Sequence, residues 1–150
     1  ILGGKITTQS LVLPVVLFFK ALLFGGIEEI GWRYFFQPTL EERIPYLSAT
    51  LITFLAWSSW HLFYFYIDGS LGVIQLLPFL VGLLTNCFTL STLYHKTQNL
   101  WICVMTHACI NSLSQILVNE DGWLSLVSKI LIISLAIMIA RKKYITLKEK

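Results

Sequence analysis

The sequence predicts an all-α protein, a polytopic bundle of about five transmembrane helices. Hydrophobic residues make up 56% of the chain and charged residues 13%, and the mean hydropathy is +0.73. That composition lies outside the usual range of soluble domains. The apolar residues gather in segments of about 20 residues, which is the length of a membrane-crossing helix and twice that of a barrel strand. The last segment ends in basic residues, as membrane helices do at their cytoplasmic side.

Five apolar segments alternate with short polar stretches. The segments are residues 11–36, 46–67, 71–94, 100–118 and 123–140. The stretches between them, predicted to be loops or turns, are residues 37–45, 68–70, 95–99 and 119–122. Pro78 predicts a kink in the third segment. With no internal repeat or linker, residues 1–150 are expected to form one domain, truncated at the N-terminus because no initial methionine is present.

Charges at the segment ends predict the orientation. The basic cluster after the last segment is expected to anchor the chain at the cytoplasmic membrane surface rather than to bind nucleic acid. Its members are Arg141, Lys142, Lys143, Lys148 and Lys150. With five crossings, the charged loops at residues 41–43 and 95–96 then also face the cytoplasm, and Asp68 and the acidic pair at 120–121 face outward. Lys5 is the one charge that disagrees.

The first segment carries three charges at its C-terminal end, on Glu28, Glu29 and Arg33. Ionisable side chains at membrane depth are costly and are therefore candidates for function. Glu29 and Arg33 are four residues apart and share a helix face, which leaves Glu28 as a carboxylate whose nearest cation is already engaged. A solvated charge pair at the lipid interface explains this stretch alone equally well.

Two other segments carry polar residues in apolar surroundings. His61 lies one helical turn after Trp57, and Asn111 lies one turn after His107. Taken singly, such residues more often serve packing and hydrogen bonding between helices. Together with Glu28 they all need partners inside the bundle, because lipid offers none. One shared polar cavity is the economical solution, and a carboxylate, two imidazoles and an amide suit hydrolysis.

Other kinds of site are not indicated. The motifs His-Glu-x-x-His, Gly-x-Ser-x-Gly and the phosphate-binding Gly-x-x-x-x-Gly-Lys are absent. Cys87, Cys103 and Cys109 lie inside apolar segments and are predicted to be reduced packing residues rather than a disulfide or zinc framework. His95, beside Lys96 in a polar connector, is predicted to be an ordinary surface histidine.

The polar residues resemble the motifs of the CAAX-processing and bacteriocin-processing (CPBP, abortive-infection-type) family of intramembrane endopeptidases. The family pattern is Glu-Glu-x-x-x-Arg, then Phe-x-x-x-His, then His-x-x-x-Asn. The stretch from Glu28 to Arg33 matches the first motif, and the stretch from His107 to Asn111 matches the third. In the second motif Trp57 replaces the usual Phe.

The resemblance extends over about residues 11–118. Residues 93–101 are similar to the family's connector before its last motif. One departure follows the motif arginine, where a small residue is usual and this chain has Tyr34. This side chain is expected to narrow the cavity.

The resemblance implies a role for each matching residue. Glu28 would be the base that activates water, and Glu29 and Arg33 would brace it. His61 would help to orient the water. His107 and Asn111 would stabilise the oxyanion. The resemblance leaves open whether the site binds a zinc ion. Its ligands would be Glu28, His61 and His107, with water in the fourth place. A water-activating glutamate without a metal is the favoured alternative.

The resemblance also implies an enzyme of the peptide-hydrolase class, an integral protein of a bacterial cell membrane with a cytoplasmic C-terminus. Its partners would be membrane lipid and a peptide or protein substrate, prenylated if processing is of the CAAX type. The alternative function is a non-catalytic bacteriocin self-immunity protein. A weaker alternative is a transporter fragment whose carboxylates relay protons.

A shared cavity makes geometric predictions. Counted at about 1.5 Å per residue, Glu28 and His107 lie at a similar depth of roughly 13 Å, whereas His61 lies at about 22 Å. The helix that carries His61 must therefore start later, tilt or sit lower than the predicted boundaries. Glu29 is expected to point away from the centre of the cavity, toward Arg33. Glu28 and the two histidines are expected within about one water of each other, at roughly 3 Å per step.

Overall fold

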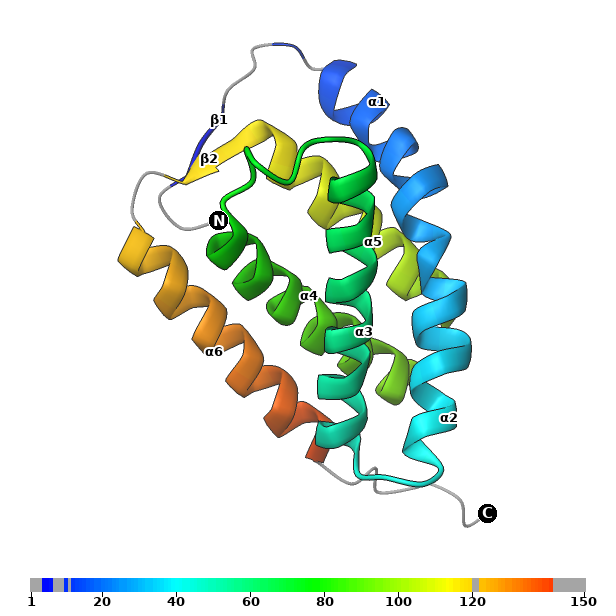
Figure 1. Ribbon diagram of the computed structural model, residues 1–150. Helices are drawn as coiled ribbons and strands as arrows, with labels where there is room; N and C mark the ends of the chain where they lie inside the picture. The colour runs from blue at the N-terminus through cyan, green and yellow to red at the C-terminus, as the bar shows by residue number, and fades with distance from the viewer. Residues whose placement is uncertain (1–3, 7–9, 11, 120–121, 142–150) are drawn as a thin grey trace.

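The computed structural model describes residues 4–6, 10, 12–119 and 122–141 (Figure 1). Its α-helices are α1 (Val12–Ala21), α2 (Gln37–Glu41), α3 (Tyr46–Ile67), α4 (Leu76–Thr97), α5 (Leu100–Ile116) and α6 (Gly122–Arg141). Two π-helical stretches, η1 (Leu22–Gly26) and η2 (Ile30–Phe36), lie between α1 and α2. The predicted all-α class is confirmed.

A short antiparallel pairing joins two distant parts of the chain. β1 (Gly4–Ile6) pairs with β2 (Leu117–Asn119), with Gly4 opposite Asn119. The sequence did not predict this pairing, because residues 4–6 stand in a polar lead-in and residues 117–118 end an apolar segment. The pairing connects the start of the described chain to the end of α5.

The first predicted segment is a long helix with altered winding. α1, η1, η2 and α2 follow one another along one side of the bundle (Figure 1). A π-helical turn bonds residue i to residue i+5, and such turns occur mainly as short insertions at functional sites. Glu28 and Glu29 lie between the two π-helical stretches. The winding therefore changes on both sides of the acidic pair.

The predicted loop after this segment is wrong over its first five residues, which form α2. Gln37 is buried, and its amide nitrogen donates hydrogen bonds to Glu41 Oε1 (2.8 Å) and Thr50 Oγ1 (3.1 Å). The Ser91 hydroxyl donates to the amide oxygen of Gln37. These bonds tie α2 to α3 and α4, so tertiary contacts rather than local composition make this stretch helical.

The predicted kink in the third segment is wrong. α3 spans the predicted residues, but α4 begins at Leu76, five residues later than expected. Pro78 therefore lies in the first turn of α4, where its missing N–H has no intrahelical partner to lose. α4 also continues to Thr97, past the predicted end.

The connector between α4 and α5 is shorter than predicted. Gln98 ends α4 in the left-handed conformation, with φ of 50°. Asn99 Oδ1 then accepts hydrogen bonds from the backbone N–H groups of Trp101 (3.0 Å) and Ile102 (3.3 Å). An asparagine in this position caps the N-terminus of a helix, so α5 begins at once.

α4 lies at the centre of the bundle and contacts α3, α5 and α6, whereas α1 and η1 pack against α5 (Figure 1). The buried apolar cluster joins α3, α4 and α5 and contains Trp57, Leu83, Cys87, Leu90 and Cys103. All three cysteines are free, and Cys109 is exposed. The prediction of reduced thiols is confirmed.

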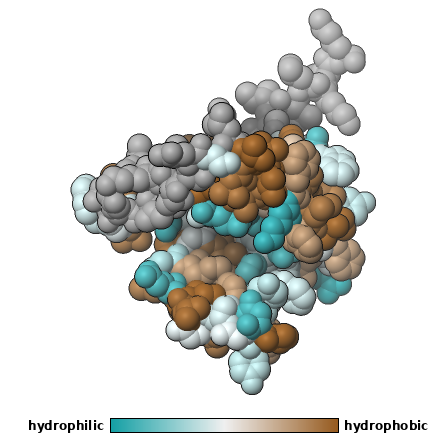
Figure 2. Space-filling model, turned by 90° about the horizontal axis from the view of Figure 1, so that it is seen from above, coloured by the Kyte–Doolittle hydropathy of each residue, from teal (hydrophilic) through white to brown (hydrophobic). Residues whose placement is uncertain are grey.

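The polarity of the molecule suits lipid surroundings. Large apolar side chains such as Phe24 and Ile67 are 73% and 81% exposed, whereas Glu29 and Arg33 are fully buried. Seen from above, hydrophobic residues cover much of the visible surface, and hydrophilic ones lie between them (Figure 2). Apolar side chains facing outward and charges facing inward are expected where lipid is the solvent.

Two helices, α4 and α6, are long and apolar enough to cross a membrane. The stretch Val12–Gly26 and α5 are apolar but shorter. α3 has sufficient length, but its serines, threonines, tyrosines and His61 lower its hydropathy. The predicted number of about five spans is therefore not confirmed.

The loops predicted to share one membrane side meet at one end of the bundle. His95 Nδ1 lies 2.7 Å from Glu41 Oε2, which joins the C-terminal ends of α2 and α4. Both side chains are partly buried, so the prediction of an ordinary surface histidine is wrong. α6 also ends here, at Arg141 (Figure 1). The other basic residues of the C-terminal cluster, the acidic pair at 120–121 and the side chain of Lys5 lie outside the described residues.

Candidate active site

Glu29 joins two elements at the centre of the site. Its Oε2 lies 3.2 Å from Arg33 Nε, and its Oε1 accepts a hydrogen bond of 2.8 Å from His107 Nδ1. The predicted pairing with Arg33 is confirmed, but the expectation that Glu29 points away from the cavity is wrong, because its other oxygen bonds to a histidine that lines the cavity. The bond to His107 depends on how the first helix packs against α5, which the sequence does not show. It fixes the imidazole so that Nε2 is the nitrogen left for other partners.

Arg33 is buried against an aromatic ring. Its guanidinium carbon lies 4.9 Å from the centre of the Trp57 ring, in the range of a cation–π contact. Among the described residues, none accepts a hydrogen bond from its guanidinium nitrogens. The negative charge of Glu29 and the aromatic face of Trp57 therefore hold Arg33 in place.

Trp57 also contacts the remaining groups of the site. Its indole N–H donates a hydrogen bond of 2.9 Å to Glu28 Oε2. Its ring packs edge-on against His61 (centroids 5.5 Å apart) and His107 (5.4 Å). A phenylalanine would give the ring contacts but not the donor. The indole therefore holds one carboxylate oxygen of Glu28 and leaves Oε1 for a water molecule.

His61, His107 and Asn111 line one cavity of about 210 Å³, as predicted, but Glu28, which was expected to share it, is not among the residues that line it. His61 Nδ1 donates to the backbone carbonyl of Trp57 (2.9 Å), which leaves Nε2 as its second hydrogen-bonding atom. Polar side chains from three helices share this cavity: His61, Asn86, His107, Asn111 and Ser114. Since α3 starts where predicted, a later start does not explain the depth of His61. α3 is instead inclined to α5 (Figure 1).

Two donor nitrogens converge beside Gly25. A Cβ atom built on this glycine would lie 2.7 Å from Asn111 Nδ2 and 3.4 Å from His107 Nε2. Only a glycine allows this close approach of η1 and α5, and the two nitrogens lie side by side against it. An amide N–H and a protonated imidazole placed together can stabilise an oxyanion.

The described residues contain no group of three histidine, cysteine, aspartate or glutamate side chains placed to hold a metal ion. The bonds that Glu28, His61 and His107 make engage Oε2 and the two Nδ1 atoms, and leave Oε1 and the two Nε2 atoms unbonded. As arranged, the three side chains do not form a group of this kind. The reaction derived below passes through no metal.

A family model described as type II CAAX prenyl endopeptidase Rce1-like matches residues 9–113. The chain belongs to this family. The predicted relation to the CPBP endopeptidases is thereby confirmed, and the chain is a member of a membrane-embedded protease family. Comparisons with curated proteins and with solved structures gave no match.

One expectation about this Rce1-like chain is corrected by the structure. Tyr34 is 61% exposed on the outside of η2 and does not line the cavity between the histidines. A side chain that faces outward cannot narrow the site. The departure from the family pattern at this position therefore leaves the cavity unchanged.

Sequence reasoning missed three residues of the Rce1-like site. Gly25 belongs to the site only because it lies close to α5, and no sequence pattern predicts that distance. Asn86 and Ser114 line the cavity beside the histidines. An asparagine inside an apolar segment is itself a signal of function or of interhelical bonding, so Asn86 could have been found by the rule that identified Asn111.

Proposed function

We propose that the chain is an intramembrane endopeptidase that hydrolyses a peptide bond near the membrane surface with a water activated by Glu28. The observation that carries the proposal is that Asn111 Nδ2 and His107 Nε2, both on α5, lie side by side against Gly25. Glu28 lies three residues after Gly25, so the carboxylate base comes from the helix that packs against the two candidate donors.

The proposed reaction begins with the carbonyl oxygen of the scissile bond within hydrogen-bonding distance of Asn111 Nδ2 and His107 Nε2. Glu28 takes a proton from water, and the hydroxide attacks the carbonyl carbon. Asn111 Nδ2–H and a protonated His107 Nε2 donate to the oxyanion that forms. When the tetrahedral intermediate collapses, the C–N bond breaks and Glu28 returns its proton to the leaving amine.

Positioning roles are proposed for the other polar residues. His61 Nε2 would orient the water, and Glu29 would hold the His107 ring through Nδ1. Arg33 would balance the charge of Glu29. The substrate class is a peptide or protein, and prenylation of that substrate is part of the proposal because the family is of the CAAX type.

Hydrolysis of a farnesylated peptide panel by the purified chain in detergent tests the proposal. Glu28→Gln keeps the shape of the side chain but removes the base, and the rate should fall by about 10²–10⁴. Glu42→Gln, on the exposed turn after α2, is the matched control and should retain activity. A Glu28→Gln enzyme that hydrolyses peptides at the rate of the parent would refute the assigned base.

The non-catalytic alternative predicts a different result from the same residues. A bacteriocin self-immunity protein that works by binding should protect cells equally well as Glu28→Gln or His107→Ala. Loss of protection in both variants, with normal amounts of protein in the membrane, supports catalysis.

A further inference from the structure

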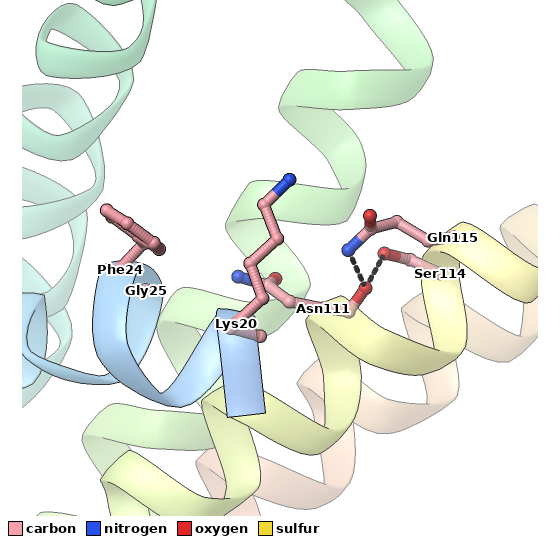
Figure 3. A pocket seen from close by; sticks show the side chains of 7 residues that line it. Lys20, Phe24, Gly25, Asn111, Ser114 and Gln115 are labelled. Carbon is pink, nitrogen blue, oxygen red and sulfur yellow. Dashed lines mark hydrogen bonds between the residues drawn. The ribbon is translucent and has the colours of Figure 1, made fainter. Parts of the chain in front are cut away.

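We propose that Lys20 binds the free C-terminal carboxylate of the peptide substrate, an inference that rests on the proposed endopeptidase function. A second cavity, of about 200 Å³, opens between the first helix and α5 (Figure 3). Lys20 and Gly25 line it from the first helix, and Asn111, Ser114 and Gln115 line it from α5. Asn111 and Ser114 also line the cavity of the histidines, so the two spaces are adjacent.

Lys20 has no acidic partner among the described residues, because no carboxylate there lies within ion-pair distance of it. The acids of the site are already engaged, Glu28 by an indole N–H and Glu29 by an arginine and a histidine. Lys20 is exposed, and the polar side chains that share its cavity, Asn111, Ser114 and Gln115, are uncharged. An anion from outside the chain would give Lys20 a partner of opposite charge.

The wall between the two cavities is held in place. Gln115 Nε2 (2.9 Å) and Ser114 Oγ (3.0 Å) both donate to the backbone carbonyl of Asn111, as the dashed lines in Figure 3 show. The side-chain amide of Asn111 makes no hydrogen bond with any described residue, and it lies beside Lys20 in the same view. A substrate that places a carbonyl against this amide can therefore extend directly toward Lys20.

The spacing fits a peptide that ends at Lys20. Lys20 and Glu28 are eight residues apart, which corresponds to at most about 12 Å along a helix. Three extended residues span about 10 Å. A peptide whose terminal carboxylate meets Lys20 thus presents a bond about three residues from its end to Glu28, and a C-terminal Cys-a-a-X sequence ends in such a carboxylate. A lipid phosphate offers similar charge but supplies no scissile bond at Asn111.

Binding to the full chain as the inactive Glu28→Gln variant tests the proposal without requiring turnover. The probes are four-residue peptides ending in Cys-Val-Leu-Ala type sequences, farnesylated and unmodified, each made as the free acid and as the C-terminal amide. The acid should bind about tenfold more tightly than its amide, as one charge-assisted contact allows. Lys20→Met should abolish the difference, and Lys129→Met on α6, the control for loss of one positive charge, should preserve it.

The possible outcomes separate the two proposals. Equal binding of acid and amide, or binding of neither, overturns the role of Lys20, and so does a preference that persists in Lys20→Met. If Lys20→Met instead lowers only the retention of phosphatidylglycerol in native mass spectra, the cavity is a lipid site and the peptide proposal fails. Preferential binding of acids by a parent chain that hydrolyses none of them supports the role of Lys20 and counts against the endopeptidase.

Discussion

Trp57 contacts more of the site than any catalytic candidate does. Its ring faces Arg33, His61 and His107, and its N–H bonds to Glu28. The side chain is almost completely buried, so these contacts are made away from water, where a hydrogen bond to a charged group contributes most. The site therefore depends on this residue to hold the base in position.

Trp57→Phe should lower kcat about tenfold to a hundredfold and leave KM nearly unchanged. The substitution keeps the aromatic contacts but removes a hydrogen bond to a carboxylate, which contributes about 1.5–3 kcal/mol. Trp60→Phe, on the exposed side of the same helix, is the matched control. Steady-state kinetics at several pH values measure kcat and KM. Thermal unfolding in detergent measures the stability of each variant. A kcat equal to that of the parent would show that the indole N–H does not position the base.

Gly25→Ala should lower kcat by about 10²–10³, the typical loss of an oxyanion donor. The new Cβ would meet Asn111 Nδ2 at 2.7 Å, and the amide must swing aside because side chains yield more readily than backbone. Stability should change little for the same reason. Gly31→Ala is the control, because a Cβ there meets nothing within 4 Å. Retention of full activity by Gly25→Ala would show that the position of the Asn111 amide does not matter to the reaction.

At the scale of elements, the contact between η1 and α5 sets the geometry of the site. The bond between His107 of α5 and Glu29, three residues after η1, lies next to this contact in the chain. Gly26 faces α5 directly, since a Cβ there would lie 2.9 Å from Val104 Cγ1 and 3.3 Å from the Val104 carbonyl oxygen. Small residues let membrane helices approach closely. The close approach brings His107 within reach of the acidic pair.

Gly26→Ala should therefore destabilise the fold by about 1–3 kcal/mol, as overpacking does, because the α5 backbone cannot move aside as a side chain can. Thermal unfolding in detergent, followed by circular dichroism, measures the loss. Combined with Val104→Ala, the substitution should cost less than the sum of the two single changes, because the closest clash is removed. If the losses of stability from the two substitutions add, the contact between Gly26 and Val104 is not the cause of the destabilisation.

At the scale of the whole molecule, the arrangement predicts which surfaces share a side of the membrane. The ends of α2, α4 and α6 lie at one end of the bundle, and the turn after α3 lies at the other (Figure 1). From the basic residues of the C-terminal sequence we propose that the first of these ends faces the cytoplasm.

Cysteines introduced as Arg43→Cys and Arg141→Cys should react with a membrane-impermeant maleimide only after cells are opened. Gly72→Cys, in the turn after α3 where a side chain meets nothing within 4 Å, should react in intact cells. The exposed native Cys109 is first replaced by serine. Labelling of Arg43→Cys and Gly72→Cys from the same side would contradict the proposed orientation.

Much of this protein followed from the sequence alone. The all-α class and the bounds of α3 came from composition and the length of apolar runs, since these properties are local. The motif residues Glu28, Glu29, Arg33, His107 and Asn111 could be found because charged and amide groups are conspicuous in an apolar chain. Their spacing also identified the family. The pairing of Glu29 with Arg33 followed from helix geometry, which places residues four apart on one face.

Other features depended on the tertiary structure. The π-helical stretches and the continuation into α2 arise where hydrogen bonds and packing from α3, α4 and α5 outweigh local preference. The bond from Trp57 to Glu28 and the contact of Gly25 with α5 join residues far apart in the chain, and no periodicity encodes a distance between two helices. The sequence alone determined which groups lipid would force inward. Only the packing of the helices decided which atoms of those groups meet.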